Sequence, residues 1–194
     1  MKKITAFFNE YSKLITKFWI YQVTMSVLGL MVSWPLAIML KEDSKYSLYM
    51  TLAVICTAGF FCFLVYDSLN QFGLRYSIRK SKGMVSELPV PADSTGLKIA
   101  AFAYAPTALL ILIYVIFFLC GFAQGQGVMV SVIYIVPIHS MYNAGWLALS
   151  GQHEVVRMIF TVATLIPATF FSWLGYYLGV RNKGVLFREK VNKE

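Results

Sequence analysis

An uncharged run of 54 residues, positions 99–152, constrains the fold of this chain more than any other feature. A helix needs about 20 apolar residues to cross a hydrocarbon core of about 30 Å. The run is therefore long enough for two crossings joined by a short turn. A soluble domain would place charged residues on its surface within such a length. We expect a membrane protein.

Three further runs are each long enough to cross a bilayer. Residues 18–40 and 158–180 carry no charge, and residues 46–74 carry only Asp67. The whole chain is 58% hydrophobic, against roughly 45–50% in soluble domains. The sequence predicts an all-α, polytopic helical bundle that forms a single membrane domain. Its five hydrophobic helices are expected at residues 18–40, 46–74, 99–123, 128–150 and 156–180.

Residues 1–17 are expected to form an additional helix that is amphipathic. Ile4, Phe7 and Phe8 belong to one helical face, and lysines occupy most of the other. This pattern predicts a helix lying in the headgroup plane, with its lysines near anionic lipid. The alternative is that these residues simply continue the first span into the cytoplasm.

Basic residues flank the apolar runs and predict the orientation. Residues 1–17 carry four, the loop at 75–98 carries five, the tail at 181–194 carries five, and the turn at 121–127 carries none. Because basic segments stay on the cytoplasmic side, we expect the N-terminus and the loop inside a plasma membrane, near anionic headgroups. The net charge of +8 is not gathered on a soluble domain, so no nucleic-acid partner is expected.

The basic tail creates a conflict, because five crossings would place it opposite the N-terminus. Pro137 lies in the middle of the fourth segment, and proline disrupts a helix by removing a donor and clashing with an earlier carbonyl. A break there would turn residues 128–150 into a re-entrant hairpin and leave the tail inside. We prefer a kinked, fully crossing helix, because 23 residues fit one span and proline is common in membrane helices.

His139 and Asn143 are the polar candidates inside that fourth segment, four residues apart and so on one helical face. Such residues mark functional sites by default, and a neutral imidazole can bind a ligand or relay a proton. The preferred interpretation is structural, as hydrogen bonds between helices worth about 1 kcal/mol. A lone histidine does not indicate a metal site, and neither a metal nor a cofactor is expected.

Asp67, Asn70 and Gln71 form a second polar group, a stripe at helical spacing that continues to Arg75. A carboxylate there could bind a cation or accept a proton. It could instead pair with Arg75 or Arg79 at the membrane interface, which is the interpretation we prefer.

Catalytic motifs are missing from the sequence, and we expect no enzyme. The string QHEVVR at residues 152–157 begins like the helix of zinc peptidases, but Arg157 stands where that motif needs its second histidine. Glu154 and Arg157 are interpreted as interfacial residues at the start of the fifth segment.

Small and polar residues recur on one face of the first and last segments. Such faces let helix backbones approach closely, within one chain or against a partner subunit. Packing within the chain is the preferred interpretation. The residues are Gln22, Ser26, Gly29 and Ser33 in the first segment, and Ser172, Gly175 and Gly179 in the last.

Two stretches of the chain resemble sequences of a known group of proteins. They are FFNEYSKLITKFWIYQVTMSVLGLMVS near the start and IPATFFSWLGYYLGVRNKGVL near the end. In these stretches and in its layout, the chain resembles a group of small uncharacterised multi-pass membrane proteins from Gram-positive bacteria. The resemblance implies a bacterial plasma membrane and a cytoplasmic tail. That group has no established activity, so the resemblance implies no functional residue.

Three functions are compatible with these features. The first is a non-enzymatic accessory protein or subunit of a membrane complex, with a membrane protein or a second copy as partner. The second is a small transporter or channel that would act as an oligomer, because five helices are few for a transport path, with that path near His139, Asn143 and Asp67. An intramembrane enzyme ranks last, because no metal or nucleophile signature is present.

Overall fold

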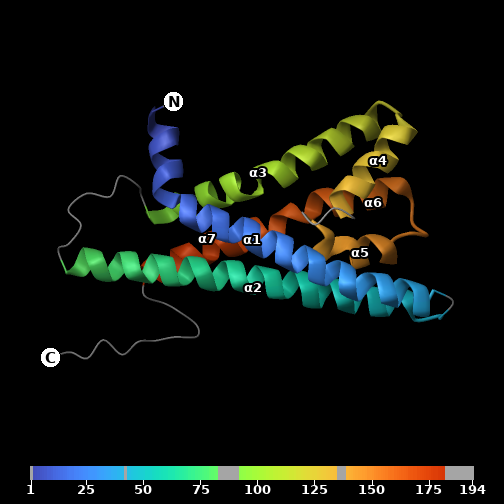
Figure 1. Cartoon of the computed structure of the whole chain (residues 1–194), viewed down its shortest axis with the longest axis horizontal. Helices are drawn as coiled ribbons and strands as arrows, with labels where there is room; N and C mark the ends of the chain where they lie inside the picture. Colours follow the sequence, from blue (N-terminus) through green and yellow to red (C-terminus); the bar gives the residue numbers. More distant parts are fainter. Residues whose placement is uncertain (1, 42, 83–91, 135–138, 182–194) are drawn as a thin grey trace.

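The computed structural model describes residues 2–41, 43–82, 92–134 and 139–181 (Figure 1). No strand occurs within these ranges, so the all-α class expected from the sequence is confirmed. The elements in chain order are α1 (Lys2–Met39), α2 (Tyr46–Ser81), α3 (Ala92–Leu119), α4 (Ala123–Tyr134), the 3-10 turn η1 (Ser140–Tyr142), α5 (Asn143–Ala148), α6 (Glu154–Ala163) and α7 (Leu165–Val180).

Four helical stretches of the described chain are long and apolar enough to cross a membrane. The last of them combines α6 and α7, which follow one another with Thr164 between them. Each stretch exceeds the length of about 20 residues that a crossing needs. The four stretches are Tyr11–Met39, Tyr46–Arg79, Ser94–Leu119 and Glu154–Val180.

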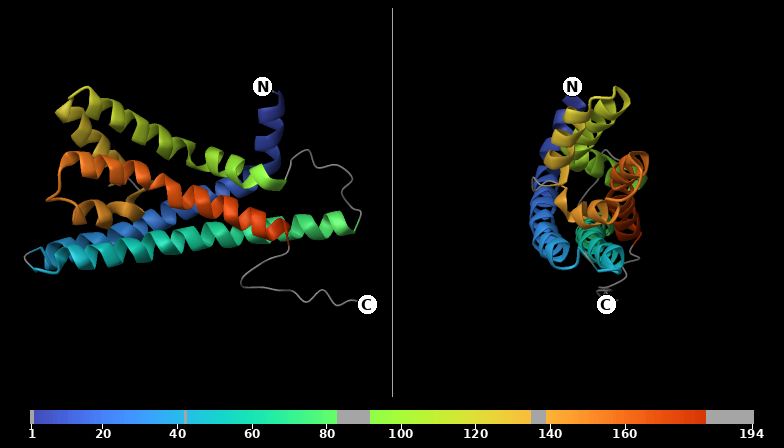
Figure 2. Two further views of the ribbon diagram at one scale, coloured as in Figure 1. Left: turned by 180° about the vertical axis from the view of Figure 1, so that it is seen from behind. Right: turned by 90° about the vertical axis from the view of Figure 1, so that its right-hand side faces the viewer.

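The fourth apolar segment, residues 128–150, is not the single kinked helix that we preferred. Helix α4 ends at Tyr134, and the described chain resumes at His139 with η1 and α5, while Pro137 lies outside the described residues. Helix α4 runs from the far end of α3 into the bundle, and α5 returns toward that same end (Figure 1, Figure 2). The segment was expected to be one helix because its length suits a single span, but length alone does not keep a helix continuous where protein covers an irregular backbone.

We call the unit made of α4, η1 and α5 the α4–α5 hairpin. Its position distinguishes the two ends of the molecule. One end of the molecule lies away from the start of α4 and the end of α5. The start of α1, the end of α2, the start of α3 and the end of α7 come together there (Figure 2). There the ring of Phe72 lies 5.7 Å from that of Tyr11 and 6.3 Å from that of Tyr176. We call this the basic end and the other the hairpin end. Basic side chains at the basic end include Lys13, Lys17, Arg75, Arg79, Lys98 and Arg181.

Two other boundaries differ from the sequence prediction. The loop expected at residues 75–98 is largely helical, because α2 continues to Ser81 and α3 begins at Ala92. Residues 2–17 are joined to the first span without a break in α1, so they do not form a separate helix. The first turns of α1 bend away from the bundle (Figure 1).

A Schellman motif ends α3 and turns the chain back into α4. Gly121 has a φ of 72°, a left-handed conformation that glycine adopts without strain. The amide of Phe122 donates to the carbonyl of Phe117 at 3.0 Å, and the amide of Gly121 donates to that of Phe118 at 3.2 Å. The rings of Phe117 and Phe122 lie 6.2 Å apart, which is the apolar contact that accompanies this motif.

Helix α7 packs against α2 with almost no side chain between the two backbones. A Cβ atom added at Gly175 would lie 2.5 Å from the carbonyl oxygen of Tyr66, and one at Gly179 would overlap the carbonyl of Asn70. Such an approach is open only to glycine at these positions. It fixes the distance between the two helices at the basic end.

We expect Gly175→Ala to destabilise the protein by about 1–3 kcal/mol, because the added methyl group must push α7 away from α2. Gly59→Ala on α2 is the matched control, since nothing lies within 4 Å of a Cβ at that position. Thermal unfolding in detergent measures both variants. Equal midpoints for the two would contradict the close packing of α7 on α2.

Candidate functional site

His139 lies buried at the tip of the α4–α5 hairpin, where it bonds to the junction of α6 and α7. Its Nε2 atom is 2.7 Å from the hydroxyl oxygen of Thr164. That hydroxyl donates its one proton to the carbonyl of Thr161 at 2.6 Å, so the imidazole must donate from Nε2. Burial away from water favours the neutral ring. His139 is thus held in one tautomer by a neighbouring helix.

Asn143 ties the same tip to α1. Its side-chain amide donates to the hydroxyl of Ser33 at 2.9 Å, and both residues are buried. The backbone of α1 also comes close, since a Cβ at Gly29 would lie 2.5 Å from the Cα of Met141. From α2, the hydroxyl of Thr57 donates to the carbonyl of Met141 at 2.7 Å.

The α4 arm of the hairpin is fastened in the same way. The Tyr134 hydroxyl lies 2.8 Å from that of Thr161, which donates to the Arg157 carbonyl of its own helix at 2.9 Å. Tyr134 is therefore the donor toward Thr161. The hairpin is bonded to α1, α2 and α6, and we call this set the central polar cluster. Its members are Ser33, Thr57, Tyr134, His139, Asn143, Thr161 and Thr164.

The structure does not bring Asp67 to this cluster. Asp67 follows Thr57 by ten residues on α2, which is about 15 Å along a helix axis. Its carboxylate accepts a hydrogen bond from Gln71 at 2.8 Å on its own helix. The amide of Asn70 turns to α7 and lies 3.4 Å from the carbonyl of Gly175. The predicted stripe is split between a local pair and a contact between helices.

The packing face predicted on the first segment lies against α3 and the hairpin. Gln22 donates to the carbonyl of Ala103 at 3.2 Å, and Ser26 is buried. On α7, the hydroxyl of Ser172 returns to the carbonyl of Ala168 at 2.8 Å. A Cβ at Gly96 of α3 would lie 2.7 Å from the Ser172 carbonyl, so α3 also approaches α7 closely.

A cavity of about 470 Å³ at the hairpin end was missed by the sequence analysis. It lies among α3, α4, α5 and α6, and both polar and apolar side chains line it. The guanidinium carbon of Arg157 stacks 3.8 Å from the centre of the Trp146 ring. Residues at its wall include Tyr114, Gln126, Val130, Trp146, Glu154 and Arg157.

The sequence analysis interpreted Arg157 as an interfacial residue and did not pair it with Trp146 of α5. The two residues flank the short turn between α5 and α6, and that turn brings them together. The available signal was an arginine in the first turn of the expected segment 156–180, which carries no other charge. Within the described ranges, no group of three or more His, Cys, Asp or Glu side chains is placed to hold a metal ion.

Comparison of the chain with protein-family models, with curated proteins and with solved structures finds no match in any of the three. Functional inference therefore depends on the geometry of the central polar cluster and of the cavity beside Arg157.

The hydrogen bond between Asn143 and Ser33 is expected to couple the two residues energetically. In a double-mutant cycle, Asn143→Ala and Ser33→Ala should be non-additive, with a coupling free energy of about 0.6 kcal/mol. Unfolding midpoints in detergent, calibrated by denaturant titration, give the four free energies. Ser131→Ala provides the control, because its exposed hydroxyl bonds only within α4. Additive effects would show that the pair does not hold the hairpin to α1.

Proposed function

We propose that this protein is a non-enzymatic subunit or accessory protein of a plasma-membrane complex. In this proposal four helical spans embed the chain, and the α4–α5 hairpin enters and leaves the membrane at the hairpin end. The observation that carries it is the central polar cluster, whose principal polar groups are bonded to the chain's own hydroxyl and carbonyl groups.

This bonding favours assembly over transport. A transport path needs polar groups that can exchange their partners with a substrate or with water. His139 and Asn143 instead donate to hydroxyl groups of other helices, and both are buried. Asp67 lies about 15 Å further along α2, counted from Thr57. The polar residues thus support a role in holding the helices together.

The distribution of charge supports an orientation with the basic end in the cytoplasm. The basic side chains named above gather where α1 begins and α7 ends, whereas the described basic residues of the hairpin end are Lys41, Lys45 and Arg157. Basic flanks stay inside and attract anionic headgroups. The re-entrant hairpin then allows both termini to lie on the cytoplasmic side.

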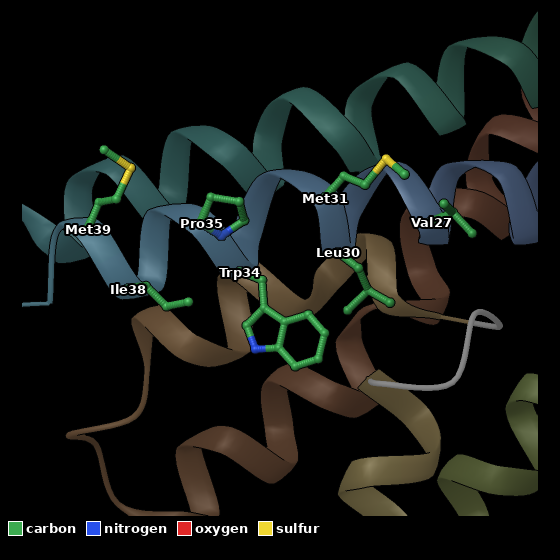
Figure 3. Close-up of a pocket in the computed structure, with 7 residues that line it drawn as sticks. All are labelled: Val27, Leu30, Met31, Trp34, Pro35, Ile38 and Met39. Carbon is green, nitrogen blue, oxygen red and sulfur yellow. The ribbon is translucent and has the colours of Figure 1, made fainter.

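The outer face of α1 is the surface proposed for a partner. A groove of about 740 Å³ is lined by seven apolar side chains that all come from α1, between Val27 and Met39 (Figure 3). Trp34 is 58% exposed and Ile38 is 78% exposed. Packing contacts drive helix association in lipid, so an uneven apolar face gives a partner helix more contact than a smooth one.

Gentle purification from native membrane, followed by mass measurement of the intact complex, tests this proposal. We expect a second membrane protein in fixed stoichiometry. Trp34→Ala combined with Ile38→Ala should release it without changing the unfolding midpoint of the chain. Leu112→Ala, at an exposed position of α3, is the control and should retain the partner. A chain that purifies alone, as monomer or homo-oligomer, would contradict the proposal and favour transport.

A further inference from the structure

The cavity at the hairpin end contains a charged group whose hydrogen-bonding edge is not satisfied by the protein. The Nε atom of Arg157 is buried and has no hydrogen-bond partner among the described residues. An unsatisfied buried donor on a charged group costs free energy, and native structures seldom leave one without a partner. The position therefore favours an acceptor supplied from outside the chain.

The stacking of Arg157 on Trp146 determines which part of the guanidinium is available. The guanidinium carbon lies over the indole ring, 3.8 Å from the ring centre. The N–H groups of a guanidinium lie in its plane, in a fork that matches two oxygens of a phosphate or carboxylate. The contact with Trp146 thus holds the guanidinium group in place at the wall of the cavity.

A second donor lines the same cavity without a partner. The indole Nε1 of Trp146 is buried and makes no hydrogen bond within the described chain. An indole N–H can only donate, as can a guanidinium. The two residues that carry these donors line one cavity, so a single oxyanion bound there would lie beside both.

Glu154 adds the opposite charge to the cavity wall. It stands one turn before Arg157 on α6, and among the interactions of the described residues no ion pair joins the two. The ring of Phe118 and the side chain of Val130 supply an apolar wall. The site lies in the first turns of a candidate span, where a bilayer presents its headgroups.

From this combination we propose that the cavity binds a zwitterionic headgroup, with its oxyanion at Arg157 and Trp146 and its ammonium group at Glu154. The apolar wall fits the start of an acyl chain, so a phospholipid with an ethanolamine headgroup has the required chemistry. Soluble phosphoethanolamine has the same two charges and is the other source. The site is independent of the partner surface on α1, so each proposal can fail without the other.

Native mass spectrometry of the full chain in detergent, titrated with defined ligands, tests the site. The probes are phosphatidylethanolamine, phosphatidylglycerol with the same acyl chains, and soluble phosphoethanolamine. We expect phosphatidylethanolamine to be retained over phosphatidylglycerol. Arg157→Gln should weaken its binding about tenfold or more, as expected for loss of a charged hydrogen bond. Arg75→Gln removes an exposed arginine at the basic end and should leave binding unchanged.

Two further variants separate the ligand contacts from the fold. Trp146→Phe keeps a ring beneath Arg157 but removes the N–H donor, so it should weaken binding several-fold at an unchanged unfolding midpoint. Glu154→Gln should reduce the preference for phosphatidylethanolamine over phosphatidylglycerol. If Arg157→Gln does not fold, Trp146→Phe decides.

The outcomes assign the ligand or reject the site. Binding that requires the acyl chains identifies a lipid, and equal binding of soluble phosphoethanolamine identifies a soluble ligand; both support the proposed chemistry. Equal retention of the two lipids by the wild-type chain, or unchanged binding by both Arg157→Gln and Trp146→Phe, would overturn it.

Discussion

The tip of the α4–α5 hairpin must have its polar backbone covered by protein, and the rest of the bundle is arranged to do so. Backbone groups outside a regular helix are tolerated at membrane depth only when protein or a water-filled cavity surrounds them. Here Thr57 donates to the carbonyl of Met141, and Gly29 allows the backbone of α1 to close over the same residue. Asn143 and His139 then bond the tip to α1 and to the α6–α7 junction.

The same hairpin explains why the two polar regions of the molecule differ. At the tip, hydroxyl groups of α1, α2 and the α6–α7 junction bond to Asn143, to the carbonyl of Met141 and to His139. At the hairpin end, Arg157 and Trp146 are brought together by the returning chain, yet their N–H groups are left without acceptors. The hydrogen bonds at the tip stabilise the fold. The unpaired N–H groups of Arg157 and Trp146 are the ones proposed to bind a ligand.

The sequence allowed much of the fold to be predicted, because apolar length and charge are local properties. The apolar runs at residues 18–40, 46–74 and 158–180 and the first part of the run at 99–152 fall within the four candidate spans, apart from Leu40. The state of residues 128–150 could not be decided locally, because it depends on contacts such as Asn143 with Ser33, 110 positions apart. The basic tail had raised the alternative of a re-entrant hairpin, which agrees with the break in helical structure after Tyr134.

The candidate site could be predicted only in part for a related reason. His139 and Asn143 were recognisable as polar residues inside an apolar run, but their partners Thr164 and Ser33 gave no signal of their own. The pairing of Arg157 with Trp146 was also missed, because the sequence does not show which side chains meet across the turn between α5 and α6. Asp67 is polar like His139, but it lies about 15 Å further along α2 than Thr57 and is not part of the central polar cluster.

The side of the membrane reached by each terminus is the most direct test of the re-entrant hairpin. Split-reporter fragments fused to the N-terminus and to the C-terminus would be compared with a tag inserted between Asp43 and Ser44, in the α1–α2 turn. The hairpin predicts both termini on one face and the inserted tag on the other. A C-terminus on the face opposite the N-terminus would show that residues 128–150 cross the membrane and would contradict the four-span fold.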